Sequence, residues 1–351
     1  MTLLRGTLIR EIFKNFPNLS FNTKNPYLKY FEQLDIMPLF KIQHITKYTY
    51  DRPVRESANQ IKIFPYANPN QQLQSQKLVI TGDPAVNLFP DYWGNTVGWF
   101  VVDNAHQELV IDSQLIVNVN SNNNINPVAT SKFSDWELLR GAISSDLKML
   151  DLAKPESIKS KEELASMVSD LRHSRDTPAM FIQRCSEYIF DEFAYKKGIT
   201  TIETTVDEIL EHKSGVCQDF AHVLLEMLRS TSIPSRYVSG YICPNQDGVR
   251  GAGATHAWVE VYLPTTGWVG IDPTNNTWVS DQHVVLAVGR HFNDCSPVKG
   301  TFKGPANQFL SVYVSVGYEN GQVIEDNNPV LMTLEPSTVP LIDYDAAQQQ
   351  Q

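Results

Sequence analysis

The chain has 351 residues, of which 42% are hydrophobic and 19% are charged; this is the length of about two ordinary domains and the composition of a folded protein. Its 29 lysines and arginines against 39 aspartates and glutamates give a formal net charge of −10. A surface that binds nucleic acid needs the opposite sign, and no apolar run reaches the ~18 residues of a membrane-spanning helix. We therefore expect neither nucleic acid nor a membrane as a partner.

The first 36 residues form a lead-in with little pattern beyond a short helix expected near residues 8–16. Charged residues interrupt the apolar stretch that a secretion signal needs, so we expect a cytoplasmic protein. Patterned sequence begins after Met37, so either translation starts there or the lead-in is a peripheral addition. The cysteines lack Cys-x-x-Cys spacing, which predicts free thiols rather than disulfides or a zinc site. They are Cys185, Cys217, Cys243 and Cys295.

A β-rich domain is predicted over residues 37–120. Runs of β-branched and aromatic residues, such as KIQHITKYTY and TVGWFVVD, alternate with Pro, Gly, Asn and Asp, which favours an antiparallel β-sandwich. The segment DYWGN, at residues 91–95, contains a Gly-Asn pair suited to a turn with positive φ. We therefore expect a hairpin there.

The predicted boundary is an Asn-rich linker over residues 121–132, since such polar, turn-prone sequence cannot bury a face. A second domain is expected over residues 133–335, and residues 336–351 are expected to form a disordered tail. The second domain starts with helices: Ser134 and Glu137 have the spacing of a capping box. Pro178 fits the first turn of a later helix.

After Pro234 the pattern changes from helices to strands, in segments such as HAWVEVYL and WVGID. Helices followed by antiparallel strands predict an α+β fold class, with helices packed on an antiparallel sheet.

Residues 214–276 carry the candidate chemistry. Apolar residues recur at helical spacing after Cys217, which places this cysteine at the start of a buried helix, and Gly215 permits a close approach just before it. A helix N-terminus favours a thiolate, and its free N–H groups can hold the oxygen of a tetrahedral intermediate. The alternative is a small buried cysteine without a catalytic role.

His256 begins one predicted strand and Asp272 ends the next, so a hairpin that turns at residues 264–267 brings them toward the same end. A two-residue turn would set Asp272 opposite Val259, whereas a wider loop would set it opposite Ala257, beside His256. In the second register the carboxylate would bind Nδ1 of His256 and leave Nε2 to take the thiol proton, which gives a Cys–His–Asp triad. Taken singly, either residue could be structural.

Three segments resemble the bacterial transglutaminase-like superfamily, a papain-fold group that includes candidate cysteine proteases: GVCQDFAHVLLEMLRSTSIPSRYVSGYI, THAWVEVYLPTTGWVGIDPTNN and VGRHFNDCSPVKGTFKG. The segments KYTYDRPV and DYWGN resemble the β-rich N-terminal region that precedes the core in these proteins. The resemblance implies Cys217 as nucleophile, His256 as general base and acid, and Asp272 as orienting carboxylate. The third segment departs from the family pattern at residues 290–294, which read RHFND.

Other polar residues near the site are weaker candidates. Tyr195 and Gln218 are possible second donors to the oxyanion. The alternative for Tyr195 is packing against the core, and the alternative for Gln218 is exposure to solvent on the first helical turn. Asp219 and His222 lie close to Cys217 in sequence but lack zinc-ligand spacing. We expect neither a metal nor a cofactor.

The expected reaction is acyl transfer from an amide through a thioester on Cys217. Water as acceptor gives a peptidase or amidase, and an amine gives a transglutaminase; we favour hydrolysis, because the sequence shows no second site that would exclude water. The expected partner is a peptide or protein substrate, and the sequence offers no argument on the oligomeric state. A hypothesis of another class is a non-catalytic binding module, with the sandwich as its recognition element.

Overall fold

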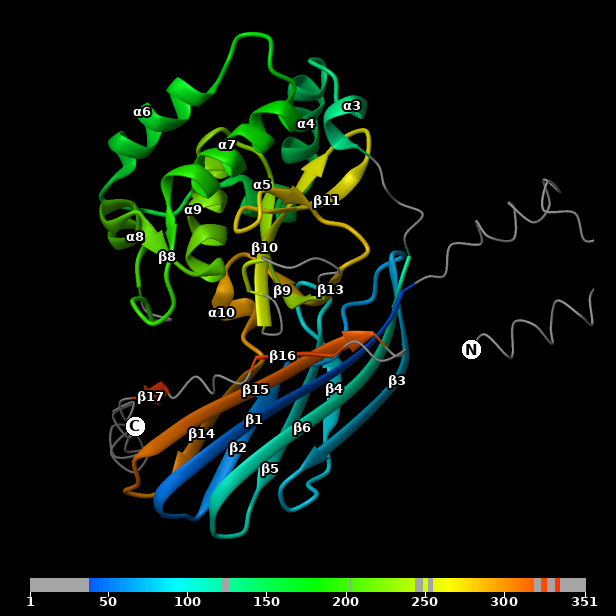
Figure 1. Cartoon of the computed structure of the whole chain (residues 1–351), viewed down its shortest axis with the longest axis vertical. Coiled ribbons are helices and arrows are strands. Elements are labelled where there is room, and N and C mark those ends of the chain that lie inside the picture. Colours follow the sequence, from blue (N-terminus) through cyan, green and yellow to red (C-terminus); the bar gives the residue numbers. More distant parts are fainter. Residues whose placement is uncertain are drawn as a thin grey trace, which may run out of the picture. The chain divides into compact units, whose positions relative to one another are not determined.

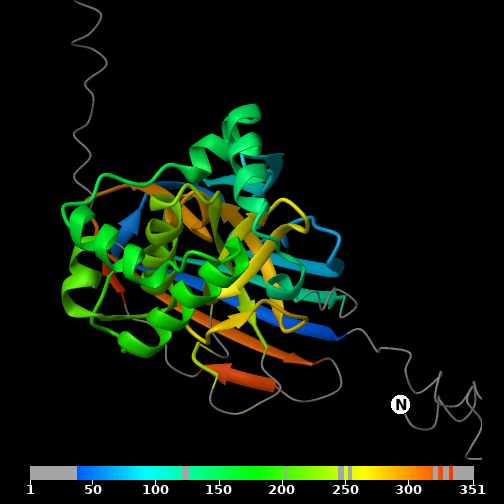
Figure 2. The same cartoon turned by 90° about the horizontal axis from the view of Figure 1, so that it is seen from above.

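The computed structural model describes residues 38–120, 126–201, 204–243, 249–251, 255–318, 323–326 and 332–334. The predicted lead-in and the predicted C-terminal tail lie outside the described residues. From Pro38 onward the chain is one compact unit, in which a helical part covers one end of a set of long strands (Figure 1). The view from above, in Figure 2, shows the helices in front of these strands.

Two antiparallel sheets form the sandwich that the alternating sequence predicts. The larger sheet has the order β16-β15-β1-β6-β3, with β17 also paired to β15, and the smaller has the order β14-β2-β5-β4. The strands that the N-terminal part of the chain gives to the sandwich are β1 (Leu39–Val54), β2 (Glu56–Ile61), β3 (Gln71–Ile80), β4 (Asn87–Pro90), β5 (Thr96–Val102) and β6 (His106–Val119). Its C-terminal strands are β14 (Val298–Lys303), β15 (Gln308–Tyr318), β16 (Val323–Asp326) and β17 (Met332–Leu334).

The C-terminal strands differ from the predicted division of the chain, which assigns them to the second domain. β15 pairs with β1 along eleven positions, from Phe40↔Tyr318 to Tyr50↔Gln308, and β14 pairs with β2. The chain therefore leaves the sandwich after β6, forms the helical part, and returns to complete both sheets. Alternating sequence identifies a strand, but it does not identify a partner far along the chain.

One face of β1 packs against two different neighbours. Its even-numbered side chains are buried from Phe40 to Tyr50. Tyr48 and Tyr50 join the core between the two sandwich sheets, whereas Phe40 and Ile42 pack with Tyr241 in a core shared with the second part of the chain. A strand buried on one face from Phe40 to Tyr50 thus joins the sandwich to the rest of the molecule.

The second part packs helices on a five-stranded antiparallel sheet, which confirms the α+β class. The sheet has the order β12-β11-β10-β9-β13, with β9 (Ser235–Ile242), β10 (Thr255–Leu263), β11 (Gly267–Asp272), β12 (Thr277–Trp278) and β13 (His283–Gly289). Two short strands, β7 (Ala194–Tyr195) and β8 (Ser214–Gly215), pair in parallel. The helices are α3 (Pro127–Thr130), α4 (Asp135–Ser145), α5 (Leu147–Ala153), α6 (Lys161–Leu171), α7 (Pro178–Glu192), α8 (Val206–His212), α9 (Cys217–Ser230) and α10 (Phe292–Cys295).

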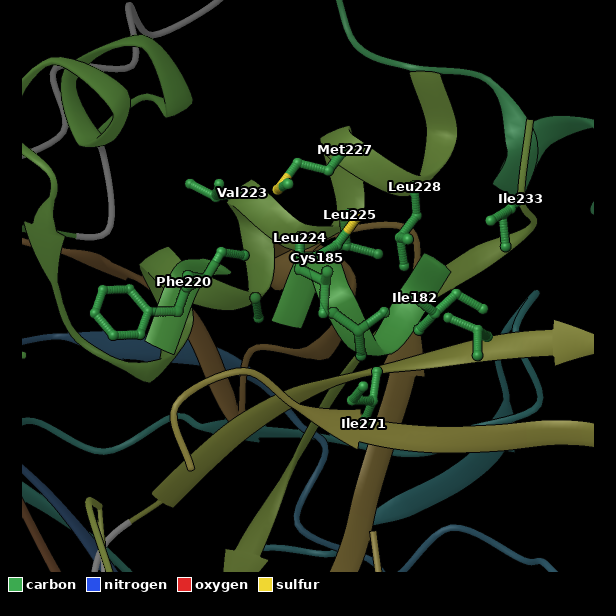
Figure 3. Close-up of a cluster of buried hydrophobic side chains, with 14 of the residues drawn as sticks. Ile182, Cys185, Phe220, Val223, Leu224, Leu225, Met227, Leu228, Ile233 and Ile271 are labelled. Carbon is green, nitrogen blue, oxygen red and sulfur yellow. The ribbon is translucent and has the colours of Figure 1, made fainter. Parts of the chain in front are cut away.

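Helix α9 lies at the centre of the main core. Apolar side chains along it, among them Phe220, Leu224 and Leu228, gather with Ile182 of α7 and Ile271 of β11 (Figure 3). Each of these side chains is almost completely buried, and burial of one such residue stabilises the fold by roughly 1.5–3 kcal/mol. The helix that begins at Cys217 is therefore firmly held.

The N-termini of three helices can be compared with the helix starts and the linker that the sequence predicts. Pro178 occupies the first turn of α7, as predicted, behind a Thr177 cap. Ser134 precedes α4, but its side chain makes no capping hydrogen bond, so the predicted capping box is wrong. Residues 126–130 of the predicted linker form a capped short helix, with the Asn126 side chain accepting from the first turn. Local hydrogen bonds thus order this part of the segment.

Two side-chain amides satisfy the outer edge of β13. The Asn95 amide exchanges two hydrogen bonds with the backbone of Val288, at 2.7 and 2.8 Å. The Gln71 amide does the same with Val285, at 2.8 and 2.9 Å. Asn95 lies at the predicted hairpin, where Gly94 has a φ of 87°, which confirms that turn. The sandwich thus supplies the partners that a neighbouring strand would give to β13.

No helix within the described ranges is both long and apolar enough to cross a membrane. The cytoplasmic location stays a prediction.

Candidate active site

The first turn of α9 presents Cys217 in the predicted position, at the first residue of the helix. The Val216 N–H donates to Oδ2 of Asp219 at 2.7 Å, and the Thr200 hydroxyl donates to the same oxygen at 2.7 Å. A Cβ at residue 215 would overlap the Asp219 carboxylate, so glycine is required there, as the sequence predicts. Asp219 therefore caps the helix that carries the thiol.

Asp219 is buried, and burial raises the pKa of its carboxyl, against the two hydrogen bonds, which lower it. Its contacts are those of a cap rather than of a ligand. His222, the other polar residue that the sequence places close to Cys217, has Nε2 3.4 Å from the N–H of Phe292. Among the residues that the structure describes, no three His, Cys, Asp or Glu side chains are grouped to hold a metal ion.

His256 and Asp272 form a buried pair where β10 begins and β11 ends. Nε2 of His256 lies 2.8 Å from Oδ2 of Asp272. The same Oδ2 accepts from the Asn275 side-chain amide at 2.7 Å, and Oδ1 accepts from the Thr274 N–H at 2.9 Å. Burial alone would raise the pKa of Asp272, but the charge and hydrogen bond of His256 outweigh it and hold this pKa well below its usual range. The carboxylate therefore stays ionised while it orients the ring.

The ring nitrogens have the opposite roles to those predicted. Because Nε2 faces Asp272, Nδ1 is the nitrogen left for the thiol, and it has no hydrogen-bond partner among the described side chains and backbone. This choice depends on how the hairpin places Asp272 relative to the ring, which the sequence pattern does not specify.

The hairpin register also lies between the two predicted ones. Val259 pairs with Ile271 and Leu263 with Gly267, and one further position along sets Asp272 opposite Trp258. Residues two apart on a strand share a face, so Asp272 shares the face of His256. The register that sets Asp272 opposite Ala257 would turn the carboxylate to the other face.

The charge state of His256 follows from its neighbours. Burial alone would lower the pKa of the ring, but the charge and hydrogen bond of Asp272, together with the Cys217 side chain, raise it to about 10. The imidazole is therefore protonated at neutral pH. A thiol at a helix N-terminus beside an imidazolium is in the environment that favours a thiolate.

Further residues near the pair have no clear signal in the sequence. Nε2 of His283 lies 3.7 Å from Oδ2 of Asp272. The Trp258 indole stacks on the His256 ring, with centroids 6.2 Å apart, and meets the His283 ring edge-on, with centroids 5.2 Å apart. A Cβ on Gly251 would lie 2.6 Å from Nδ1 of His256, so only glycine lets this backbone approach the ring. Asn275 is the exception. It lies in the segment PTNN, directly after Asp272, and a side-chain amide so close in sequence is a candidate donor to the carboxylate.

A cavity of about 240 Å³ opens beside Cys217 and His256. Gln218, one of the candidate oxyanion donors, lines it. The other candidate, Tyr195, has its ring edge-on to Phe220 at 6.1 Å, so it packs against the core.

Residues 290–294, which read RHFND, include two residues that hold the loop in place and one that lines the cavity. The Arg290 guanidinium donates to Oε1 of Glu156 at 2.9 Å and to the carbonyl of Lys154 at 2.6 Å, which ties the loop after α5 to β13. Asp294 accepts from the Arg290 N–H at 2.8 Å. Phe292, between them, lines the cavity.

Comparisons with known proteins agree with this architecture. Residues 165–273 match the model of the transglutaminase-like superfamily, and residues 40–118 match that of the bacterial transglutaminase-like N-terminal region. An uncharacterized protein of Mycobacterium tuberculosis is 30% identical over 293 residues, which cover 79% of this chain and 92% of that protein. A protein-glutamine gamma-glutamyltransferase of Pseudomonas aeruginosa is 31% identical over 121 residues, which cover 31% of this chain and 18% of that enzyme.

The fold is also that of a solved structure. A candidate cysteine protease from Cytophaga hutchinsonii superposes with a TM-score of 0.63 at 16% identity, over 84% of this chain and 96% of that one. The likeness extends over both the sandwich and the helical part. The chain therefore belongs to the transglutaminase-like superfamily and carries the N-terminal region found in bacterial members.

Proposed function

We propose that the protein is a cysteine-nucleophile acyl-transfer enzyme that hydrolyses amide bonds, as a peptidase or amidase. The observation that supports this most strongly is the shared cavity of Cys217 and His256, with Asp272 holding the ring through Nε2 so that Nδ1 stays available to the thiol. A binding module has no use for a buried, charged histidine beside a helix-terminal cysteine.

In the first step the Cys217 sulfur attacks the amide carbonyl carbon, and the negative charge moves to the carbonyl oxygen. The N–H of Cys217, one of the first-turn groups that a helix leaves unused, stabilises this oxygen. Gln218 is the better candidate for a second donor, because it lines the cavity and Tyr195 packs on the core. Nδ1 of the imidazolium then gives its proton to the leaving amine as the C–N bond breaks.

The second step releases the acyl group from the thioester. A water molecule gives its proton to Nδ1 of His256 while its oxygen attacks the carbonyl, and the C–S bond then breaks to return the thiolate. Asp272 keeps its charge throughout and stabilises the imidazolium whenever it forms.

The test is mass spectrometry of glutamine-containing peptides incubated with the protein, with and without an excess of a primary amine. We expect cleaved peptide or free acid, with or without the amine, and no product with Cys217→Ala. Cys243→Ala is the matched control, since Cys243 is buried in the core shared with the sandwich, and it should retain the activity.

A transglutaminase is the second candidate, and its support is the similarity to the Pseudomonas aeruginosa glutamyltransferase. A dominant amine adduct would replace hydrolysis by this reaction. No product under either condition, together with Cys217 alkylation no faster than that of a small free thiol, would favour the binding module instead.

A further inference from the structure

The sandwich forms one wall of the cavity at the candidate site. Thr46 and Tyr48 of β1 line it together with Val312 and Leu310 of β15. Thr46 pairs with Val312 and Tyr48 with Leu310, and paired residues of antiparallel strands share a face. These four side chains therefore make a continuous surface on the larger sheet, in the same cavity as Cys217.

This wall lies where the two cores along β1 meet. Tyr48 belongs to the core between the sandwich sheets, and Phe40 belongs to the core shared with the helical part. At Thr46, between them, the sheet faces the cavity instead of a packed neighbour. The position of the wall is fixed by packing on both sides of it.

Outside the Cys217 and His256 pair, the walls of the cavity carry no permanent charge. None of its described lining residues is Asp, Glu, Lys or Arg, although the chain has 68 such residues (29 + 39). His44 also lines the cavity. Burial lowers the pKa of its ring to about 4, so this ring is neutral at pH 7. Its Nδ1 lies 2.8 Å from the Tyr241 hydroxyl and its Nε2 lies 3.3 Å from the Thr46 hydroxyl, which holds Thr46 in place.

The size of the cavity limits what it can hold. Its volume of about 240 Å³ exceeds the ~150 Å³ of a cavity that holds benzene, and it is below the ~300 Å³ at which pockets for larger ligands begin. The cavity therefore has room for one aromatic or branched side chain with its amide.

From these observations we propose that the sandwich wall selects the substrate: the acyl donor carries one uncharged, mainly apolar side chain next to the reacting amide, and Val312 and Thr46 are specificity-determining residues. The proposal rests on the proposed function of Cys217 as nucleophile. On the sandwich wall a charged side chain would lose its hydration against Thr46, Val312 and Leu310, which offer it no opposite charge, so it is excluded.

The experiment measures rates of Cys217 alkylation by three chloroacetamides that differ only in their substituent, which is benzyl, carboxymethyl or aminoethyl. We expect the wild-type protein to prefer the benzyl reagent by at least about tenfold, after correction for the rate of each reagent with a small free thiol. Val312→Lys should raise the carboxymethyl rate relative to the aminoethyl rate by about tenfold, and Val312→Glu should do the reverse, because each new charge lies on the wall.

Ser311→Lys and Ser311→Glu are the matched controls, since Ser311 is the neighbouring residue of β15 and pairs with Lys47 on the other face of the sheet. Their rate ratios should stay close to the wild-type values. Equal wild-type rates for all three reagents, or Ser311 variants that shift the ratios as much as Val312 variants, would overturn the proposal. The wild-type comparison still decides the matter if a Val312 variant does not fold.

Failure of the nucleophile and failure of the selecting wall give different results. Alkylation as slow as that of a free thiol, with the benzyl preference intact, would count against acyl transfer and still support the wall. Fast alkylation with no preference among the reagents would support the nucleophile and refute the wall.

Discussion

Asp272→Asn is the substitution that tests the site most directly, because it conserves size and shape but not hydrogen-bonding capacity. Three donors converge on the carboxylate: the Thr274 N–H on Oδ1, and His256 Nε2 and the Asn275 amide on Oδ2. An amide offers one acceptor oxygen and one NH2 group. Whichever way the asparagine is turned, at least one buried donor faces its NH2 group.

The magnitude follows from these contacts. A buried donor left without an acceptor costs about 1–3 kcal/mol, and the charge-assisted bond to His256 contributes about 1.5–3 kcal/mol that a neutral amide does not restore. We therefore expect Asp272→Asn to lower the free energy of unfolding by on the order of 3 kcal/mol at pH 7. Without the carboxylate, burial dominates and lowers the pKa of His256, so the ring becomes neutral and Cys217 loses its cationic partner.

Two assays check these effects separately. Urea unfolding measures the stability, with exposed Asp103 changed to Asn as a control that should stay within about 0.5 kcal/mol of wild type. The rate of Cys217 alkylation at pH 7 should fall by at least about tenfold. An unchanged urea midpoint would refute the hydrogen-bond argument, and an unchanged pH profile of alkylation would refute the role of the carboxylate in charging His256.

Three further outcomes follow from other contacts. Gly215→Ala forces a methyl group against a buried carboxylate, so it should cost about 1–3 kcal/mol of stability and slow Cys217 alkylation; Gly141→Ala, with open space around it, should not destabilise, and equal effects would contradict the close approach. Asn95→Ala leaves the N–H and carbonyl of Val288 unpaired, so urea unfolding should show a loss of about 2–4 kcal/mol, and a loss below ~0.5 kcal/mol would contradict the edge-strand account. The raised pKa of His256 stabilises the fold fully below pH 6.5 and progressively less as the pH rises through about 10; the urea midpoint of wild type should therefore fall more steeply over this interval than that of His256→Gln, and parallel curves would refute the assignment.

Much of the candidate site follows from local sequence. Helical spacing after Cys217 is a property of a few consecutive turns, so the start of α9 at this residue could be predicted. The same holds for the need for glycine at residue 215 and for the turn at Gly94. The α+β class follows from the order of helical and alternating segments, which needs no knowledge of pairing.

The tertiary structure decided what depends on contacts between distant residues. The pairing of β15 with β1, the hairpin register that sets Asp272 on the face of His256, and the choice of Nε2 over Nδ1 all depend on the relative positions of two elements. A periodic pattern shows which face of one element is buried, but it carries no information on the neighbour that buries it or on the register between them. For this reason the sequence by itself identifies the nucleophile, its base and its carboxylate as candidates, whereas the wall that faces them from β1 and β15 exists only in the folded chain.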